Sequence, residues 1–236
     1  MLLPENVVSV CIFGSMARGD HDERSDADVL VVVRDRSGKI SEKVVSDFVR
    51  PWVGRTPTIS WYGQKRLQEM FESGHLFAWH LYYECRPVWG PLSIQEIFGR
   101  PAPYEDALLD ISSFQEVMAD IPAALQHCPR NVVYEMGLLY VCVRNIAMSA
   151  SWHMCDKPDF TRYSPFHLGQ RKFGASRAEY ALAMLCRMAS QRGIRISDSV
   201  ECNRVFHLQE ALFLWSQDIT ADVEENVRQQ SSQSKS

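Results

Sequence analysis

The sequence has no excess of basic residues. Its 236 residues include 25 Lys and Arg against 29 Asp and Glu, which gives a formal net charge of −4 at pH 7. Proteins that bind long nucleic acids usually present a surplus of positive charge to the phosphates. The sequence therefore does not predict a broad nucleic-acid-binding surface, although a local basic patch is compatible with this balance.

The sequence also lacks a C-x-x-C pair, and its cysteine number is odd. Disulfide frameworks and zinc sites use paired cysteines at regular spacings. We therefore expect reduced thiols, several of them in the core. The seven cysteines are Cys11, Cys85, Cys128, Cys142, Cys155, Cys186 and Cys202.

A targeting signal is not recognised either. The first residues, MLLPENVVSVCIF, are apolar but have no basic leader, and they read as a first strand. We find no apolar run that approaches the length of a membrane span. These observations predict a cytoplasmic protein with no membrane partner.

The composition that is present, 46% hydrophobic and 23% charged, is typical of a globular protein with a sizeable core. Apolar, β-branched runs predict strands at 7–13, 29–33 and 57–62, and helical periodicity predicts a helix at 41–52. The run at 29–33, VLVVV, is continuously apolar, so we expect both of its faces to be covered.

A proline-rich stretch between residues 87 and 103 is interpreted as a domain boundary. The predicted organisation is a domain at 1–100, a helical domain at 101–222 and a disordered tail at 223–236, whose sequence is polar and low in complexity. In the second domain the periodicity predicts helices at 104–127, with a bend or break at Pro122, and at 131–153, 175–192 and 200–215.

The most informative stretch is CIFGSMARGDHDERSDADVLVVV, residues 11–33. Gly14 lets the backbone turn after the first strand, and Ser15 is placed to cap a short helix whose N–H groups could bind an anion. Asp26 and Asp28 fall on one side of an extended strand, about 6 to 7 Å apart.

Two such carboxylates repel each other unless a cation lies between them, and Mg²⁺ suits oxygen ligands of this kind. A phosphate cradle beside a Mg²⁺ site is the apparatus of phosphoryl or nucleotidyl transfer. The alternative is that Asp26 and Asp28 merely serve a surface turn. The combination with Gly14, Ser15 and Ser25 disfavours it.

Gly14-Ser15, ten further residues and then Asp26-Ala27-Asp28-Val29 resemble the signature of the DNA polymerase β-like nucleotidyltransferase superfamily. The fuller run is similar to its minimal bacterial branch, which includes antitoxin-type members and antibiotic adenylyltransferases. The resemblance implies an α+β fold: a small mixed β-sheet core with flanking helices, followed by a C-terminal helical bundle.

The resemblance also implies the roles of the motif residues. Gly14 and Ser15 would hold the triphosphate, while Asp26 and Asp28 would be both catalytic residues and ligands of Mg²⁺, or of Mn²⁺ in its place. Arg18 and Ser25 are further candidates for nucleotide binding, and a solvated helix residue is an equal interpretation of Arg18.

The sequence departs from the pattern at a third carboxylate, which the resemblance implies on the next core strand. Thr58 occupies the matching position, or Ser60 if the register slips by two residues. Either another acid (Glu69, Glu72 or Glu84) supplies the charge, or the enzyme works with two carboxylates, or activity is lost and nucleotide binding is kept.

The favoured function is a Mg²⁺-dependent nucleotidyltransferase that moves an NMP from an NTP to a hydroxyl acceptor. The acceptor is a small molecule, a side chain of a partner protein or a nucleotide end, and a second copy of the chain is a further candidate partner. The alternative is a catalytically silent nucleotide-binding or toxin-neutralising antitoxin module.

Overall fold

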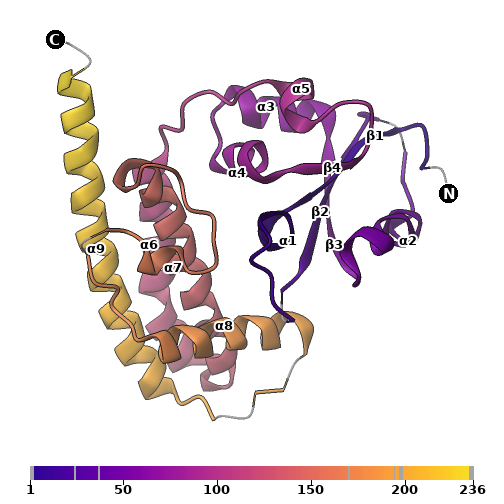
Figure 1. Ribbon diagram of the computed structural model, residues 1–236. Coiled ribbons are helices and arrows are strands. Elements are labelled where there is room, and N and C mark those ends of the chain that lie inside the picture. Colours follow the sequence, from indigo (N-terminus) through magenta and orange to yellow (C-terminus); the bar gives the residue numbers. More distant parts are fainter. Residues whose placement is uncertain are drawn as a thin grey trace. The chain divides into compact units, whose positions relative to one another are not determined.

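The computed structural model describes residues 3–23, 25–36, 38–169, 171–193, 195–196 and 199–233 (Figure 1). The chain divides into two compact units, Met1–Glu105 and Asp106–Ser236. This division lies close to the boundary that the proline-rich stretch predicts. Each unit has buried apolar residues of its own.

The first unit is built on a four-stranded sheet with the order β3-β2-β1-β4. β1 pairs antiparallel with both β2 and β4, whereas β2 pairs parallel with β3. A mixed sheet with flanking helices, followed by a helical unit, confirms the predicted α+β class. The strands are β1 (Val7–Phe13), β2 (Ala27–Val33), β3 (Pro57–Gly63) and β4 (Arg86–Trp89).

β4 was not predicted, because Pro87 was interpreted as part of a boundary. A proline cannot donate to a strand ladder, but β4 is an edge strand of this sheet, where proline is tolerated. The fourth strand of the sheet therefore contains a proline, a residue that is unfavourable in central strands.

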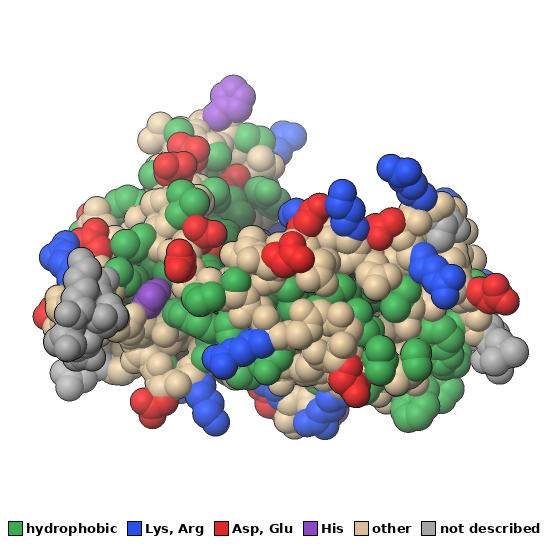
Figure 2. All heavy atoms as spheres, turned by 90° about the horizontal axis from the view of Figure 1, so that it is seen from above, with side chains coloured by type: hydrophobic (Ala, Val, Ile, Leu, Met, Phe, Trp, Pro, Cys, Tyr) green, Lys and Arg blue, Asp and Glu red, His purple; other side chains and the backbone are tan. Residues whose placement is uncertain are grey.

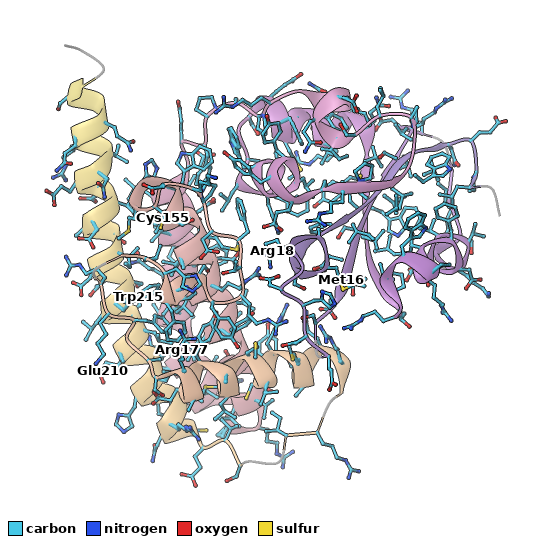
Figure 3. The ribbon with its side chains drawn as sticks, viewed as in Figure 1. Met16, Arg18, Cys155, Arg177, Glu210 and Trp215 are labelled. Carbon is cyan, nitrogen blue, oxygen red and sulfur yellow. The ribbon has the colours of Figure 1, made fainter. Side chains whose placement is uncertain are left out.

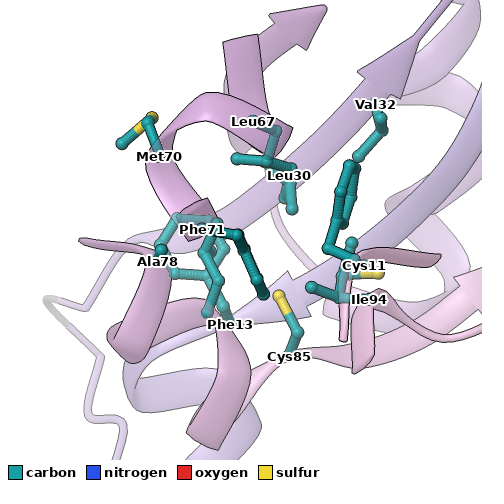
Figure 4. Close-up of a cluster of buried hydrophobic side chains, with 12 residues drawn as sticks. Cys11, Phe13, Leu30, Val32, Leu67, Met70, Phe71, Ala78, Cys85 and Ile94 are labelled. Carbon is teal, nitrogen blue, oxygen red and sulfur yellow. The ribbon is translucent and has the colours of Figure 1, made fainter. Parts of the chain in front are cut away.

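Apolar clusters cover both faces of the sheet, as the continuous apolar run of β2 predicts. Leu30 and Val32 belong to one cluster, which includes residues of α3 (Gln64–Glu72), α4 (Leu76–Glu84) and α5 (Ile94–Phe98) and is drawn in Figure 4. The alternate residues of β2, Val29 and Val31, belong to the other cluster, with residues of α2 (Glu42–Val53). All four β2 side chains are fully buried.

The second unit is helical. Its central helix, α7, packs against the other three long helices, and its residues Met136, Leu139, Val143 and Ile146 are fully buried. The long helices are α6 (Ala107–His127), α7 (Val132–Met154), α8 (Arg177–Arg192) and α9 (Cys202–Gln233), and two 3-10 turns are η1 (Pro129–Asn131) and η2 (Ser164–Phe166).

The C-terminal helix is longer than predicted. The tail was expected to be disordered from residue 223, but α9 continues to Gln233, so that expectation is wrong over 223–233. Val223 is fully buried, and the next two turns are linked by Glu224–Arg228 and Glu225–Gln229 hydrogen bonds at i, i+4 spacing. Residues 234–236 lie outside the described residues.

The expected break at Pro122 is wrong, because α6 runs from Ala107 to His127 with the proline inside it. Ile121 and Leu125, on either side of the proline, are buried. Packing of this apolar face keeps the helix continuous although Pro122 removes a backbone hydrogen bond.

One segment of the described residues, Pro129–Met154, is long and apolar enough to cross a membrane, with a mean hydropathy of 1.2 over 18 residues. The expectation that no run approaches this length is therefore wrong. However, 56% of that window is buried inside the protein. Burial of this kind is typical of the core helix of a helical unit, and α7 has that position.

Charges of both signs are mixed on the face shown in Figure 2, where Lys and Arg side chains alternate with Asp and Glu. This face has no broad area of a single sign. The picture agrees with the nearly balanced charge of the sequence.

Gly137 allows α7 and α8 to approach closely, and this contact gives a first prediction. A Cβ atom at position 137 would lie 2.7 Å from the backbone N and Cα of Arg187. Gly137→Ala should destabilise the protein by about 1–3 kcal/mol, because the backbone overlap outweighs the gain in helix propensity. The measurement is the free energy of unfolding from urea denaturation.

Ser113→Ala is the control, because Ser113 is an exposed residue in the middle of α6. Because position 113 is exposed, alanine gains helix propensity there without the backbone overlap of position 137, and Ser113→Ala should change stability by less than about 0.5 kcal/mol. Equal stability of Gly137→Ala and the wild type would contradict close packing at this position.

Candidate active site

The glycine of the motif lies directly against one of its carboxylates. β1 ends at Phe13, which pairs with Asp28 of β2, and α1 (Gly14–Arg18) begins at the next residue. Gly14 has a φ of +68°, and a Cβ atom there would lie 2.7 Å from Asp28 Oδ2. The position therefore requires glycine both for its backbone conformation and for the space that the carboxylate occupies.

Asp26 and Asp28 flank Ala27 at the start of β2. Ala27 between them is fully buried, while both aspartates are half-buried. Asp28 is in β2 and Asp26 directly precedes the strand, so the alternation of an extended chain puts both carboxylates on the side opposite Ala27. Their like charges therefore face the same space.

The third carboxylate position is occupied by Thr58. The parallel pairing of β2 with β3 sets Asp28 opposite Thr58 and Leu30 opposite Ser60. Thr58 is thus the β3 residue beside Asp28, and it is exposed. Among the described residues, no group of three or more His, Cys, Asp or Glu side chains is placed to hold a metal ion.

The two aspartates nevertheless fit a magnesium ion. Mg²⁺ in phosphoryl-transfer sites is commonly held by one or two carboxylates together with substrate phosphates and water. The bare backbone of Gly14 leaves room for the Asp28 carboxylate at the end of β1, which is where such a site would form.

The two serines of the motif have different surroundings. Ser15 is inside α1 rather than at its cap, because the helix begins one residue earlier, and no side-chain capping bond is made. The hydroxyl of Ser25, a buried residue, donates to Asp22 Oδ1 at 2.8 Å and accepts from the Asp22 N–H at 2.9 Å. Ser25 therefore shapes the loop that leads into Asp26.

Arg55 fixes the same loop and was missed by sequence analysis. Its Nη1 donates to the carbonyls of Ser25, at 2.7 Å, and of Asp22, at 3.1 Å. A single arginine between α2 and β3 gives no recognisable signal in the sequence, because its partners are 30 and 33 positions away.

Comparison with known proteins indicates which class of enzyme has a site of this kind. Residues 2–75 match the family described as "Nucleotidyltransferase domain". This stretch, less than half of the chain, is similar to that family. The match includes all six predicted motif residues and confirms both the superfamily and the enzyme class that the motif indicates. A search of curated proteins finds no significant match.

A solved structure with a similar extent is the spectinomycin adenyltransferase AAD(9) from Enterococcus faecialis, determined with ATP and spectinomycin. The match covers 93% of this chain and 92% of that one, with 12% sequence identity and a TM-score of 0.44. A TM-score below 0.5 is too low to transfer a substrate.

Arg18 of the nucleotidyltransferase domain is held by acidic residues. Its Nη1 donates to both carboxylate oxygens of Glu84, at 2.7 and 2.9 Å, and its Nε donates to Asp20 at 3.2 Å. Met16 packs against the Val29 cluster, and Figure 3 shows Met16 and Arg18 leaving α1 in different directions. α1 is therefore anchored on both sides.

The other acids that could replace the third carboxylate lie on α3. Glu69 is within 4.0 Å of Lys65 and 3.6 Å of Arg66, and Glu72 accepts a hydrogen bond from Gln68. Glu69 and Glu72 therefore already have partners on their own helix. Within the part of the chain that the structure describes, Glu84 is the candidate that is hydrogen-bonded to a motif residue, Arg18.

The close approach of Gly14 to Asp28 gives a second prediction. Gly14→Ala should destabilise the domain by about 2–3 kcal/mol, because alanine is strained at positive φ and its Cβ overlaps the carboxylate. Gly19→Ala is the matched control: Gly19 has a φ of +83°, and a Cβ atom there would meet nothing within 4 Å among the described residues. Urea denaturation of both variants separates the strain of positive φ, which both variants share, from the overlap with the Asp28 carboxylate, which is expected for Gly14→Ala.

The double variant Gly14→Ala/Asp28→Ala should recover part of the loss, since it removes the overlapping oxygen. If Gly14→Ala were no more destabilising than Gly19→Ala, the Asp28 carboxylate would not lie against Gly14.

Proposed function

We propose that the chain is a Mg²⁺-dependent nucleotidyltransferase that moves an NMP from an NTP to a hydroxyl acceptor, with release of pyrophosphate. The observation that carries this proposal is the placement of the Asp28 carboxylate against the bare backbone of Gly14, with Asp26 on the same side of the strand. The match to the nucleotidyltransferase family supports it.

In this proposal Asp26 and Asp28 hold the metal, and Gly14, Ser15 and Arg18 contact the triphosphate. Bound Mg²⁺, or Mn²⁺, would neutralise the phosphates and stabilise the leaving pyrophosphate. Ser25 acts through the loop that it shares with Asp22 and Arg55, which sets the direction in which Asp26 enters the site.

The absence of a carboxylate at position 58 supports a second candidate, a nucleotide-binding or toxin-neutralising module without catalysis. Thr58 faces Asp28 across β2 and β3 and cannot take a proton from an acceptor at neutral pH. We favour the enzyme, because a module that only binds would gain little from two adjacent like charges.

The acceptor and the cellular location also belong to the proposal. The helical unit, which the family match does not include, is assigned the selection of the acceptor, and the expected location is the cytoplasm. The acceptor is a small molecule, a protein side chain or a nucleotide end. The nearly balanced charge disfavours a long nucleic acid.

The test is to incubate the protein with each α-labelled NTP and Mg²⁺, with and without cell extract. Label on a protein, on a small molecule or in a ladder of oligonucleotides identifies the acceptor class. If no NTP gave label in any fraction while nucleotide still bound, the silent module would be the better description.

The aspartate pair gives a third prediction. Asp26→Ala and Asp28→Ala should each lower the transfer rate about 10³-fold or more, because the metal site loses a ligand. The melting temperature should stay level or rise, since removing one like charge relieves repulsion. Radiolabel transfer and thermal denaturation measure the two effects.

Glu23→Ala is the control for these variants, because Glu23 is an exposed acid of the same loop. It should leave the transfer rate within about twofold of the wild type. Retained turnover in both aspartate variants would exclude a metal site at this pair.

Thr58 gives a fourth prediction. Thr58→Asp should raise the transfer rate about tenfold or more, because it introduces an ionised oxygen beside Asp28 that can ligate metal or accept a proton. Asparagine has nearly the same shape as aspartate but no charge, so Thr58→Asn should not raise the transfer rate. A rate for Thr58→Asp at or below the wild-type rate would mean that the missing acid does not limit this enzyme.

A further inference from the structure

Glu84 is a carboxylate with most of its acceptor capacity already in use. Oε1 accepts from Arg18 Nη1 at 2.9 Å, and Oε2 accepts from the same nitrogen at 2.7 Å. His80 Nε2 lies 2.8 Å from Oε2, and because an ionised carboxylate can only accept, this nitrogen donates. Glu84 therefore accepts hydrogen bonds from both Arg18 and His80.

The Glu84 side chain is only 8% exposed, and its surroundings favour the ionised form. Burial by itself would raise the pKa of Glu84, but the hydrogen bonds and charges of His80 and Arg18 outweigh it and hold the pKa below its usual value. At neutral pH Glu84 is a fixed negative charge beside the motif helix.

Glu84 is held on a rigid element. α4 has Ala78 and Leu81 fully buried against the sheet, and Trp79 Nε1 donates to the Ala102 carbonyl at 2.9 Å. The position of the Glu84 carboxylate is therefore set by the core of the domain rather than by its own flexible chain.

Arg18 is only partly used by these contacts. Within the described residues, its hydrogen bonds are made by Nε and Nη1, and its side chain is 20% exposed. Nη2 remains to donate to a ligand. A guanidinium fixed at two of its nitrogens donates to a phosphate with less loss of side-chain entropy than a mobile one.

We infer that Glu84 is a positioning residue that orients the Arg18 guanidinium for the phosphates of the nucleotide, and that it is not a substitute for the missing third carboxylate. A metal ligand or general base needs an available oxygen lone pair directed at the reacting atoms, whereas both Glu84 oxygens are directed at Arg18. This inference rests on the proposed function, because it assigns Arg18 to the triphosphate.

The test compares Glu84→Gln with Glu42→Gln, a control at an exposed acid in the first turn of α2. Binding of α,β-methylene ATP and GTP in the presence of Mg²⁺ is measured by calorimetry, and NMP transfer is measured with labelled NTP. Glu84→Gln should weaken analogue binding and raise KM about tenfold, with kcat within about twofold of the wild type. Glu42→Gln should change neither analogue binding nor the kinetic constants.

A metal-ligand or general-base role for Glu84 predicts the opposite division, with binding kept and kcat reduced about 10² to 10⁴-fold, and that result would overturn the inference. In an Arg18→Met background, Glu84→Met should cause no further loss of affinity, because its effect passes through Arg18. This apolar pair removes both charges of the Arg18–Glu84 ion pair together, so the comparison stands if Glu84→Gln folds poorly.

Failure of this inference and failure of the proposed function give different results. A wild type that transfers NMP, together with a Glu84→Gln variant that binds and reacts like it, contradicts the positioning role alone. A wild type that binds the analogue without transfer to any acceptor contradicts the proposed enzyme, and the binding comparison still decides the role of Glu84. A wild type that binds neither analogue contradicts both.

Discussion

The pairing of β1 with β2 is the constraint on which the candidate site depends. It sets Phe13 opposite Asp28, so the chain must turn at Gly14 directly beside a carboxylate. A side chain at position 14 would occupy the space of the Asp28 oxygen, and the φ of +68° excludes most residues as well. The same pairing extends into the buried valines of β2. The packing of the core therefore fixes the position of Asp28 at the start of this strand.

Much of the first unit could be predicted because its signals are local. The run at 7–13 forms β1 with those bounds, and the carboxylates lie on one side of the chain because an extended backbone alternates. The parallel register then selected Thr58 over Ser60 as the residue beside Asp28, a choice that the sequence alone left open.

The contacts that support the site could not be predicted, because they join residues far apart in the chain. Glu84 reaches Arg18 across 66 positions, and Arg55 reaches Ser25 across 30. A lone arginine or glutamate has no period or spacing that marks its partner. The end of α9 was missed for a related reason: its composition is polar, and burial of Val223 is a tertiary effect.

A substitution at position 58 can change the charge beside Asp28 without disturbing the core of the domain. β3 is at the edge of the sheet, and Thr58 is exposed on it, whereas Asp28 opposite is fixed by the core behind it. A carboxylate could be gained or lost at this place without repacking any buried residue. An acid at position 58 would therefore change the charge beside Asp28 and leave the interior of the sheet as it is.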